Sequence, residues 1–292
     1  MTASPPRPGT PPRGPSAGCL LVVATPIGNL DDLSPRARQA LADCDLILAE
    51  DTRRVRKLLN HFGIKTRAQA FHEHNERQLQ PRVLAMLEQG ARLALVCDAG
   101  TPLLADPGYR LVHQCRTLGL PVTAVPGPCA VVAALSVAGL PPMPFSFLGF
   151  LPPTGEARRH ALARAAALTH TLVFFLSPHR LAAELHDCAE VLGGQRQAAL
   201  VAELTKRHER CLLAPLAELA TSAETAQPRG EYTLVVGPPE VPAPMEVTPE
   251  QARAAVEQAL LAGWPLSEAR RQAAQALGIT RRKLYHLLLA QR

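Results

Sequence analysis

The sequence Cys19-Leu-Leu-Val-Val-Ala24, followed directly by Thr25-Pro-Ile-Gly-Asn-Leu30, decides the fold class. The apolar run has the length of a buried strand, and the Pro- and Gly-containing segment after it predicts a turn. Similar apolar runs, separated by stretches of helical character, occur at 46–49, 92–96 and 122–125. Because strands that alternate with helices form parallel sheets, we expect an α/β domain over residues 18–125.

The alternation continues less regularly after Pro126-Gly-Pro128, where we expect a second α/β domain over residues 126–237 to begin. The chain has 292 residues, of which 47% are hydrophobic. A chain of that length usually builds two hydrophobic cores. Strands are expected in the second domain at 145–150, 171–176, 198–203 and 232–236.

Helix signals fill the spaces between these strands. Ser34 followed by Pro35 predicts an N-cap and a first helical residue. Asp51 or Thr52 is expected to cap a basic helix that ends before Gly63, and a helix is expected at about 79–89.

The two ends of the chain have a different character. Residues 1–17 are rich in Pro and lack the apolar core of a signal peptide, which predicts a disordered tail. Residues 238–248 have the composition of a linker, and residues 249–292 predict three short helices capped at Ser267 and Thr280. The last two helices are similar to a helix-turn-helix, which favours contact with nucleic acid; a dimerisation or packing module is the alternative.

Charge and cysteine content exclude several classes of protein. The net charge of +6 is concentrated at the ends, because residues 1–17 hold two Arg and no acid and residues 246–292 hold seven basic residues against four Glu. Seven dispersed cysteines without a C-x-x-C pair fit neither a disulfide framework nor a zinc ribbon and suggest a reducing, cytoplasmic location. The uncharged stretch 117–155 is broken by prolines, so no membrane span is expected.

Three turn-rich loops each follow a predicted strand: 25–30, 98–108 and 126–128. Loops at the carboxyl ends of parallel strands meet at the ligand crevice, so one ligand could contact all three; structural turns would explain any one of them alone. Neither the G-x-G-x-x-G nor the P-loop pattern is present, which disfavours a dinucleotide site and a Walker-type phosphate site.

Three polar segments are candidates for chemistry. Glu50-Asp51-Thr52-Arg53-Arg54 places two cations at a helix start, where they interact unfavourably with the helix dipole. An RNA phosphate or an internal salt bridge with the adjacent carboxylates would offset this cost. In His72-Glu-His-Asn-Glu76, alternation on a strand or loop would place His72, His74 and Glu76 on one side. Since H-x-H alone is weak evidence for a metal and no third ligand is evident, a polar substrate-lining role is favoured over a metal site. Lys206, one of only four lysines, could accept a proton once desolvated.

As a set and in this order, seven motifs resemble the ribosomal RNA small subunit methyltransferase I family, which has the tetrapyrrole-methylase fold. The motifs are A-T-P-I-G-N-L-D-D (24–32), A-E-D-T-R (49–53), H-E-H-N-E (72–76), D-A-G-T-P-L-L-A-D-P-G (98–108), V-P-G-P-C-A (125–130), S-P-H-R (177–180) and E-L-T-K (203–206). The resemblance covers about residues 19–237, and the helical tail also matches.

The resemblance implies two α/β domains with S-adenosylmethionine in the cleft between them, a homodimer, and 2′-O-methylation of a cytidine in the 16S rRNA of the small ribosomal subunit, without a metal. The cofactor would be held by Pro26, Gly28, Asp98, Ala99, Gly100, Thr101, Pro102, Pro126, Gly127, Pro128 and Ala130. RNA would be bound by Arg53, Arg54, His72, Asn75, Arg281, Arg282 and Lys283. Catalysis would involve Glu50, Lys206 and Asp51, with Glu50 or Lys206 as the base.

The chain departs from the family at one position. Members commonly carry Tyr-Glu before S-P-H-R, whereas Phe175-Leu176 stands here, so a carboxylate is absent from the second-domain side of the cleft. Two rival functions are a methylase of small tetrapyrroles, which shares the fold, and a nucleic-acid-binding assembly factor with an inactive site, which only Leu176 supports. The Arg-rich segment after Glu50, and T-P-I-G-N in place of the tetrapyrrole enzymes' G-x-G-P-G turn, favour RNA.

Overall fold

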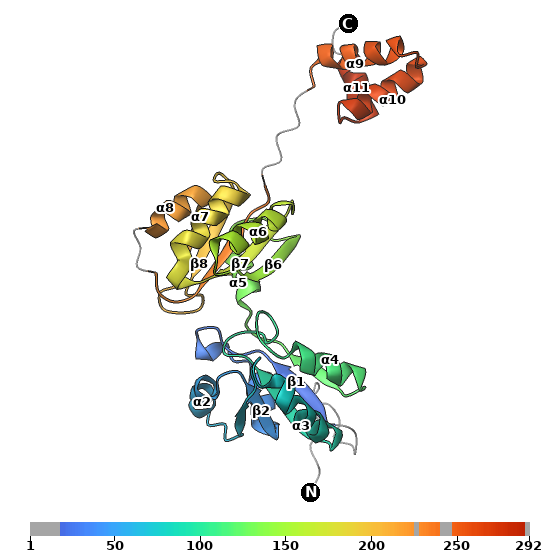
Figure 1. Ribbon diagram of the computed structural model, residues 1–292. Helices are drawn as coiled ribbons and strands as arrows, with labels where there is room; N and C mark the ends of the chain where they lie inside the picture. The colour runs from blue at the N-terminus through green and yellow to red at the C-terminus, as the bar shows by residue number, and fades with distance from the viewer. Residues whose placement is uncertain (1–17, 225–227, 240–246, 290–292) are drawn as a thin grey trace. The chain divides into compact units, whose positions relative to one another are not determined.

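The computed structural model describes residues 18–224, 228–239 and 247–289. They belong to two compact units, Met1–Pro239 and Glu240–Arg292 (Figure 1). The expected tail at 1–17 and most of the expected linker at 238–248 lie outside the described residues. The finer division of the chain into domains stays a prediction.

The first sheet contains five parallel strands in the order β3-β2-β4-β1-β5. The strands are β1 (Cys19–Val23), β2 (Leu46–Ala49), β3 (Ala68–Ala70), β4 (Arg92–Val96) and β5 (Val122–Val125). β1 lies between β4 and β5, and Leu21 pairs with Ala94 on one side and Thr123 on the other. The predicted parallel α/β sheet is confirmed. Only β3 was not predicted, because three half-buried residues carry no periodic pattern.

Helices cover both faces of this sheet. They are α1 (Pro35–Asp43), α2 (Thr52–His61), α3 (Glu76–Glu88) and α4 (Tyr109–Thr117), with a 3-10 turn η1 (Leu30–Asp32) before α1. α1 and α2 pack with Leu21 and Val23, whereas α3 and α4 pack with Leu20 on the opposite face. Ser34 caps α1 as predicted, since its Oγ accepts the Ala37 N–H at 3.1 Å.

The second sheet is mixed, in the order β6-β7-β10-β8-β9, and only the β6–β7 pair is parallel. Its strands are β6 (Phe145–Phe150), β7 (Thr171–Leu176), β8 (Gln197–Ala202), β9 (Arg210–Pro215) and β10 (Tyr232–Val236). The edge strand β9 and the helix after it were not predicted. β9 is exposed along most of its length, so its apolar residues do not follow a half-buried alternation.

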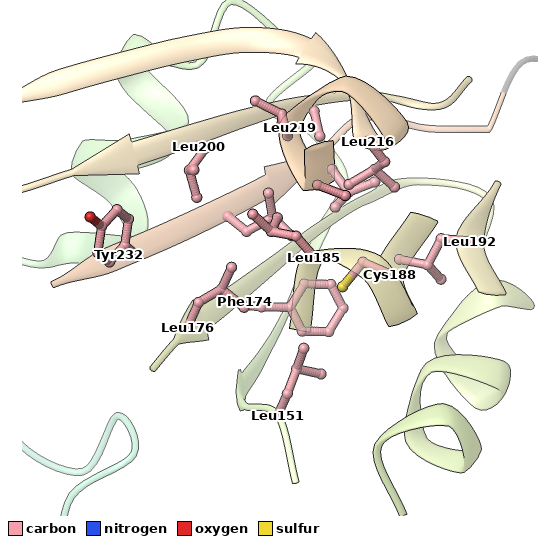
Figure 2. Packing of buried hydrophobic residues seen from close by; sticks show 14 of the residues in the cluster. Leu151, Phe174, Leu176, Leu185, Cys188, Leu192, Leu200, Leu216, Leu219 and Tyr232 are labelled. Atoms are coloured by element: carbon pink, nitrogen blue, oxygen red, sulfur yellow. The ribbon is translucent and has the colours of Figure 1, made fainter. Parts of the chain in front are cut away.

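Helices α6 (Gly155–Ala166), α7 (Leu181–Leu192) and α8 (Leu216–Glu224) cover one face of the second sheet, with the 3-10 turn η2 (Pro178–Arg180) before α7. Figure 2 shows Phe174 of β7 beside Leu185 and Cys188 of α7 in this core. Helix α5 (Ala130–Val137) packs on the opposite face, where its Ala134 joins Val173 and Val235.

The second unit consists of α9 (Pro249–Leu261), α10 (Leu266–Ala276) and α11 (Arg281–Leu289) around a small apolar core. Thr280 caps α11 as predicted, because its Oγ1 accepts the Lys283 N–H at 3.2 Å. The prediction that Ser267 caps α10 is wrong: Pro265 is the N-cap, and Ser267 lies inside the first turn. Among the described residues, no helix is both long and apolar enough to cross a bilayer.

Candidate functional site

The three predicted loops meet at the carboxyl edge of the parallel sheet. Thr25 and Gly100 exchange two backbone hydrogen bonds of 2.8 and 3.0 Å, and Thr101 Oγ1 donates to the Pro128 carbonyl at 3.0 Å. Gly100 has a positive φ of 85°, and a Cβ there would lie only 3.2 Å from Ile27 Cγ2. The loops after β1, β4 and β5 are therefore tied together, as the sequence predicted.

These loops line one side of a cleft of about 560 Å³. The first-sheet side is formed by Ile27, Glu50, Arg54, 98–101 and 104–106, and the second-sheet side by Phe150, Phe175, Leu176, Pro178, His179 and 230–233. Residues 129–131, at the start of α5, complete the lining. The volume lies in the range of small-ligand sites. The first-sheet side carries Glu50, Asp98 and Asp106, whereas the second-sheet side combines apolar residues with the polar His179 and Glu231.

Five of the eleven residues expected to hold a cofactor line this cleft. They are Asp98, Ala99, Gly100, Thr101 and Ala130. The other six, Pro26, Gly28, Pro102, Pro126, Gly127 and Pro128, do not line it. Gly28 instead faces the loop after β8, because a Cβ on it would lie 2.5 Å from Lys206 Cγ and 2.8 Å from the Leu204 carbonyl oxygen.

Glu50 follows β2 and faces the cleft with Asp98 and Asp106. Burial raises the pKa of Glu50, and the nearby charges of Asp98 and Asp106 raise it further. Burial also raises the pKa of Asp106. Arg54 Nε lies 3.4 Å from Asp98 Oδ2 and is the guanidinium group that faces these acids. Glu50 is therefore a carboxylate whose environment favours taking up a proton.

The neighbouring Asp51 has the opposite electrostatics. Its Oδ1 accepts the Arg53 N–H at 2.8 Å and caps α2, and its Oδ2 lies 2.8 Å from Arg53 Nη2. Hydrogen bonds from Arg53 lower the pKa of Asp51 to about 2. The side chains of Asp51 and Arg53 thus form the internal salt bridge that the sequence offered as an alternative to phosphate binding.

Lys206 lies at the start of the loop after β8, beside Gly28. Its Nζ donates to Glu203 Oε1 at 2.8 Å and to Glu231 Oε2 at 3.2 Å. Burial alone would lower the pKa of Lys206, but the hydrogen bonds and charges of the two glutamates outweigh it and the pKa is raised. This arrangement favours a charged ammonium group over a proton acceptor.

The expected strand-like alternation of 72–76 is wrong. The His72 N–H donates to Asn75 Oδ1 at 2.8 Å and Asn75 Nδ2 donates to the Ala70 carbonyl at 3.1 Å, so Asn75 holds a tight turn. Helix α3 then starts at Glu76 instead of residue 79. As a result Glu76 is buried, while His74 is exposed and His72 half-buried.

The remaining expected RNA contacts lie in the second unit. Arg281, Arg282 and Lys283 form the first turn of α11, and all three are exposed. Among the described residues, one group of side chains is close enough to hold a metal: His186, Asp187 and Glu190 of α7. Asp187 is already paired with Arg158 at 2.5 Å and does not line the cleft.

Sequence reasoning missed part of the cleft. Asp106 lies in a loop that was singled out, but nothing marked it as facing Glu50. The apolar side, with Phe150 and Phe175, depends on how the second sheet packs beside the first, which no local pattern reports. Leu176 does line the second-sheet side, where the departure from the family suggested. Arg180, which such a carboxylate could have paired with, pairs with Glu184 at 2.9 Å.

Comparison with known proteins gives a consistent result. A family model for tetrapyrrole (corrin/porphyrin) methylases matches residues 20–220. Ribosomal RNA small subunit methyltransferase I of Pseudomonas aeruginosa is 45% identical over 276 residues, covering 94% of this chain and 98% of the relative. The protein of the same name from Escherichia coli O157:H7 is 45% identical over 278 residues, covering 94% and 96%.

Two solved structures share the fold at low identity. Diphthine synthase matches 75% of this chain and 89% of its own, with a TM-score of 0.60 and 13% identity. Uroporphyrin-III C-methyltransferase from Thermus thermophilus, complexed with S-adenyl homocysteine, matches 75% and 97%, with a TM-score of 0.54 and 20% identity.

Proposed function

Because the chain belongs to the ribosomal RNA small subunit methyltransferase I family of the tetrapyrrole methylases, we propose that it methylates the ribose 2′-oxygen of a cytidine in 16S rRNA with S-adenosylmethionine as methyl donor. The observation that carries the proposal is 45% identity over 98% of a relative with that name. A methylase of small tetrapyrroles is less well supported, since the uroporphyrin-III C-methyltransferase described above is only 20% identical.

The cleft has the chemistry that S-adenosylmethionine requires. The sulfonium and ammonium groups of this cofactor are cationic, and Glu50, Asp98 and Asp106 supply carboxylates. Its flat adenine ring suits the apolar side with Phe150 and Phe175. We assign its binding to Asp98, Ala99, Gly100, Thr101 and Ala130, with the other six predicted positions supporting the loops.

When bound, S-adenosylmethionine supplies a sulfonium methyl group, which forms a bond to the attacking ribose 2′-oxygen as the carbon–sulfur bond breaks and its electron pair leaves with sulfur. Glu50 is the residue suited to take the proton from the 2′-hydroxyl, because it faces the cleft and its pKa is raised. Lys206, held as an ammonium, and Asp51, which caps α2, position the loops around the ribose.

The surroundings of the cleft support an RNA substrate. Arg54 lies at the cleft, and the basic turn of α11 offers a second contact with the RNA backbone. The exposed Arg53 and the half-buried His72 are further candidate contacts. The substrate implies a cytoplasmic location. No metal is required in this proposal, because the sulfonium is already electrophilic.

We further propose that the protein is a homodimer. Large apolar side chains stand exposed on α5, on β6 and on the edge strand β9: Val132, Val137, Phe145, Leu212 and Leu213 are each 40–56% exposed. An apolar surface of this kind marks a protein–protein interface more often than a bare monomer surface.

The test is methyl transfer from labelled S-adenosylmethionine to small ribosomal subunits that lack ribose methylation, followed by nuclease digestion and mass spectrometry. Label on one cytidine 2′-oxygen is expected. Cofactor binding without transfer to subunits or to naked 16S rRNA would overturn the proposal and favour a small-molecule methylase.

A further inference from the structure

A second cavity, of about 320 Å³, lies beside the cleft and shares a wall with it. Glu50, Ala105 and Asp106 line both. The rest of the second cavity comes from the turn before α3 and from the start of α4, and includes Glu73 and Tyr109. A ligand in the second cavity that contacts Glu50 therefore also borders the cleft.

This cavity offers hydrogen-bond acceptors that the fold leaves free. Glu76 is only 5% exposed, and its Oε1 accepts the Leu111 N–H at 3.3 Å. Within the described part of the chain, no hydrogen bond or ion pair engages Glu76 Oε2. The carboxylate of Glu73 is exposed at the same cavity. Carboxylates that line an open cavity can accept hydrogen bonds from a ligand.

The start of α4 supplies donors to the same cavity. Gly108 is the N-cap and offers no side-chain cap, and a Cβ on it would lie 2.7 Å from Leu95 Cδ2. The Tyr109 and Arg110 N–H groups, in the first turn, find no acceptor among the described backbone groups. Arg110 is among the residues that line the cavity.

An aromatic ring stands at this cavity. Tyr109 is 70% exposed, and its ring stacks on His113 with a centroid distance of 5.9 Å and an interplanar angle of 21°. Stacking on His113 restrains the tyrosine ring and leaves it exposed to a planar ligand. Bases of single-stranded RNA stack on such rings.

We propose that the second cavity binds the cytosine base of the nucleotide whose ribose is methylated beside Glu50. This inference rests on the proposed function. The base and the 2′-oxygen belong to one nucleoside, so a base subsite must adjoin the cleft that holds the methyl donor. Carboxylates accept from the cytosine 4-amino group, and N–H groups donate to its ring nitrogen and carbonyl oxygen. Uracil would present its O4 to the carboxylates, so the cavity selects against it.

The first experiment measures base choice. Small subunits are reconstituted with 16S rRNA carrying cytidine or uridine at the methylated position, and kcat/KM is measured for each. Glu73→Gln is expected to lower the cytidine-to-uridine preference about tenfold or more, because an amide both donates and accepts. Glu88→Gln, an exposed change at the other end of α3, is the control and is expected to keep the wild-type preference. An unchanged preference in Glu73→Gln overturns the proposal.

The second experiment separates base stacking from cofactor binding. Tyr109→Ala is expected to lower kcat/KM for subunits about tenfold and to leave the Kd for S-adenosylmethionine unchanged, whereas Tyr109→Phe keeps wild-type activity. Tyr109→Ala with full activity, or with equally weakened cofactor binding, overturns the base subsite. A wild-type chain that binds cofactor but methylates no RNA overturns the proposed function itself, which is a different result.

Discussion

The two sides of the cleft differ in chemistry and in origin. The first-sheet side carries Glu50, Asp98 and Asp106 on loops that follow parallel strands. The second-sheet side presents the apolar Phe150, Phe175 and Leu176 of the mixed sheet, with His179 and Glu231 beside them. The two sides therefore have different roles in the cleft. Parallel strands bring polar loops to one edge, where burial and the neighbouring Asp98 and Asp106 raise the pKa of Glu50.

Glu50→Gln would remove the proton acceptor from the acidic side and have the largest effect. We expect kcat/KM to fall about 10²- to 10⁴-fold. In the wild type the rate should fall on acidification while the pH is still above the ordinary glutamate value of 4.5, because Glu50 must be ionised and its pKa is raised. A pH–rate profile that keeps this limb in Glu50→Gln would remove Glu50 from the role.

Thermal denaturation of the same variant controls for unfolding. Since the folded-state pKa of Glu50 is raised, its ionised form opposes folding above pH 4.5. Glu50→Gln should therefore raise Tm at neutral pH, and this gain should disappear as the pH falls below that value.

Variants of Phe174 and Phe175 test whether ligand binding by the second-sheet side can be separated from the stability of the core behind it. Phe174 is 1% exposed and packs against α7, whereas Phe175 faces the cleft. Phe174→Ala should cost about 3–5 kcal/mol in urea unfolding. Phe175→Ala should cost less stability but weaken S-adenosylmethionine binding about tenfold, measured by calorimetry. Equal effects of the two variants on stability and binding would contradict this assignment.

Leu176→Glu restores the carboxylate that the family commonly carries. It would add a carboxylate to the second-sheet side of the cleft. Leu176 is 2% exposed, and Arg180 already pairs with Glu184, so the new charge would be buried without a partner. We expect a loss of roughly 2 kcal/mol at neutral pH, with recovery in acid as the glutamate is protonated. Leu176→Gln is the uncharged control, and a gain in activity from Leu176→Glu would show that the missing group takes part in catalysis.

Asp51→Ala should have the smallest effect. It separates the structural role of Asp51 from the proton-accepting role of Glu50. Asp51 caps α2 and pairs with Arg53, so its loss should lower Tm modestly and leave the acid limb of the rate profile in place. The pKa of Asp51 is lowered from 3.8 to about 2. Its stabilising contribution is thus complete above pH 3.8 and lost as the pH falls through about 2, where wild type and variant should converge.

The acidic side could be predicted from sequence and the apolar side could not. Strand ends are marked by Gly and Pro, so Asp98 and Gly100 were found, and the order of parallel strands brings such ends together. Phe150 and Phe175 occur in strands whose cleft-facing side depends on packing between sheets. The turn at 72–75 was missed because the Asn75 side chain replaces a strand's backbone hydrogen bonds, a local competition that alternation does not reveal.

Gly28 does not line the cleft, yet it lies where loops from the two sheets meet. The loops it separates come from opposite sheets: a Cβ on Gly28 would lie 2.8 Å from the Leu204 carbonyl oxygen, and the Asn29 N–H donates to Thr205 Oγ1 at 3.1 Å. Because glycine has no side chain, the two loops can approach each other this closely. Any larger residue would force one of these loops to shift, although every residue that lines the cleft would be unchanged.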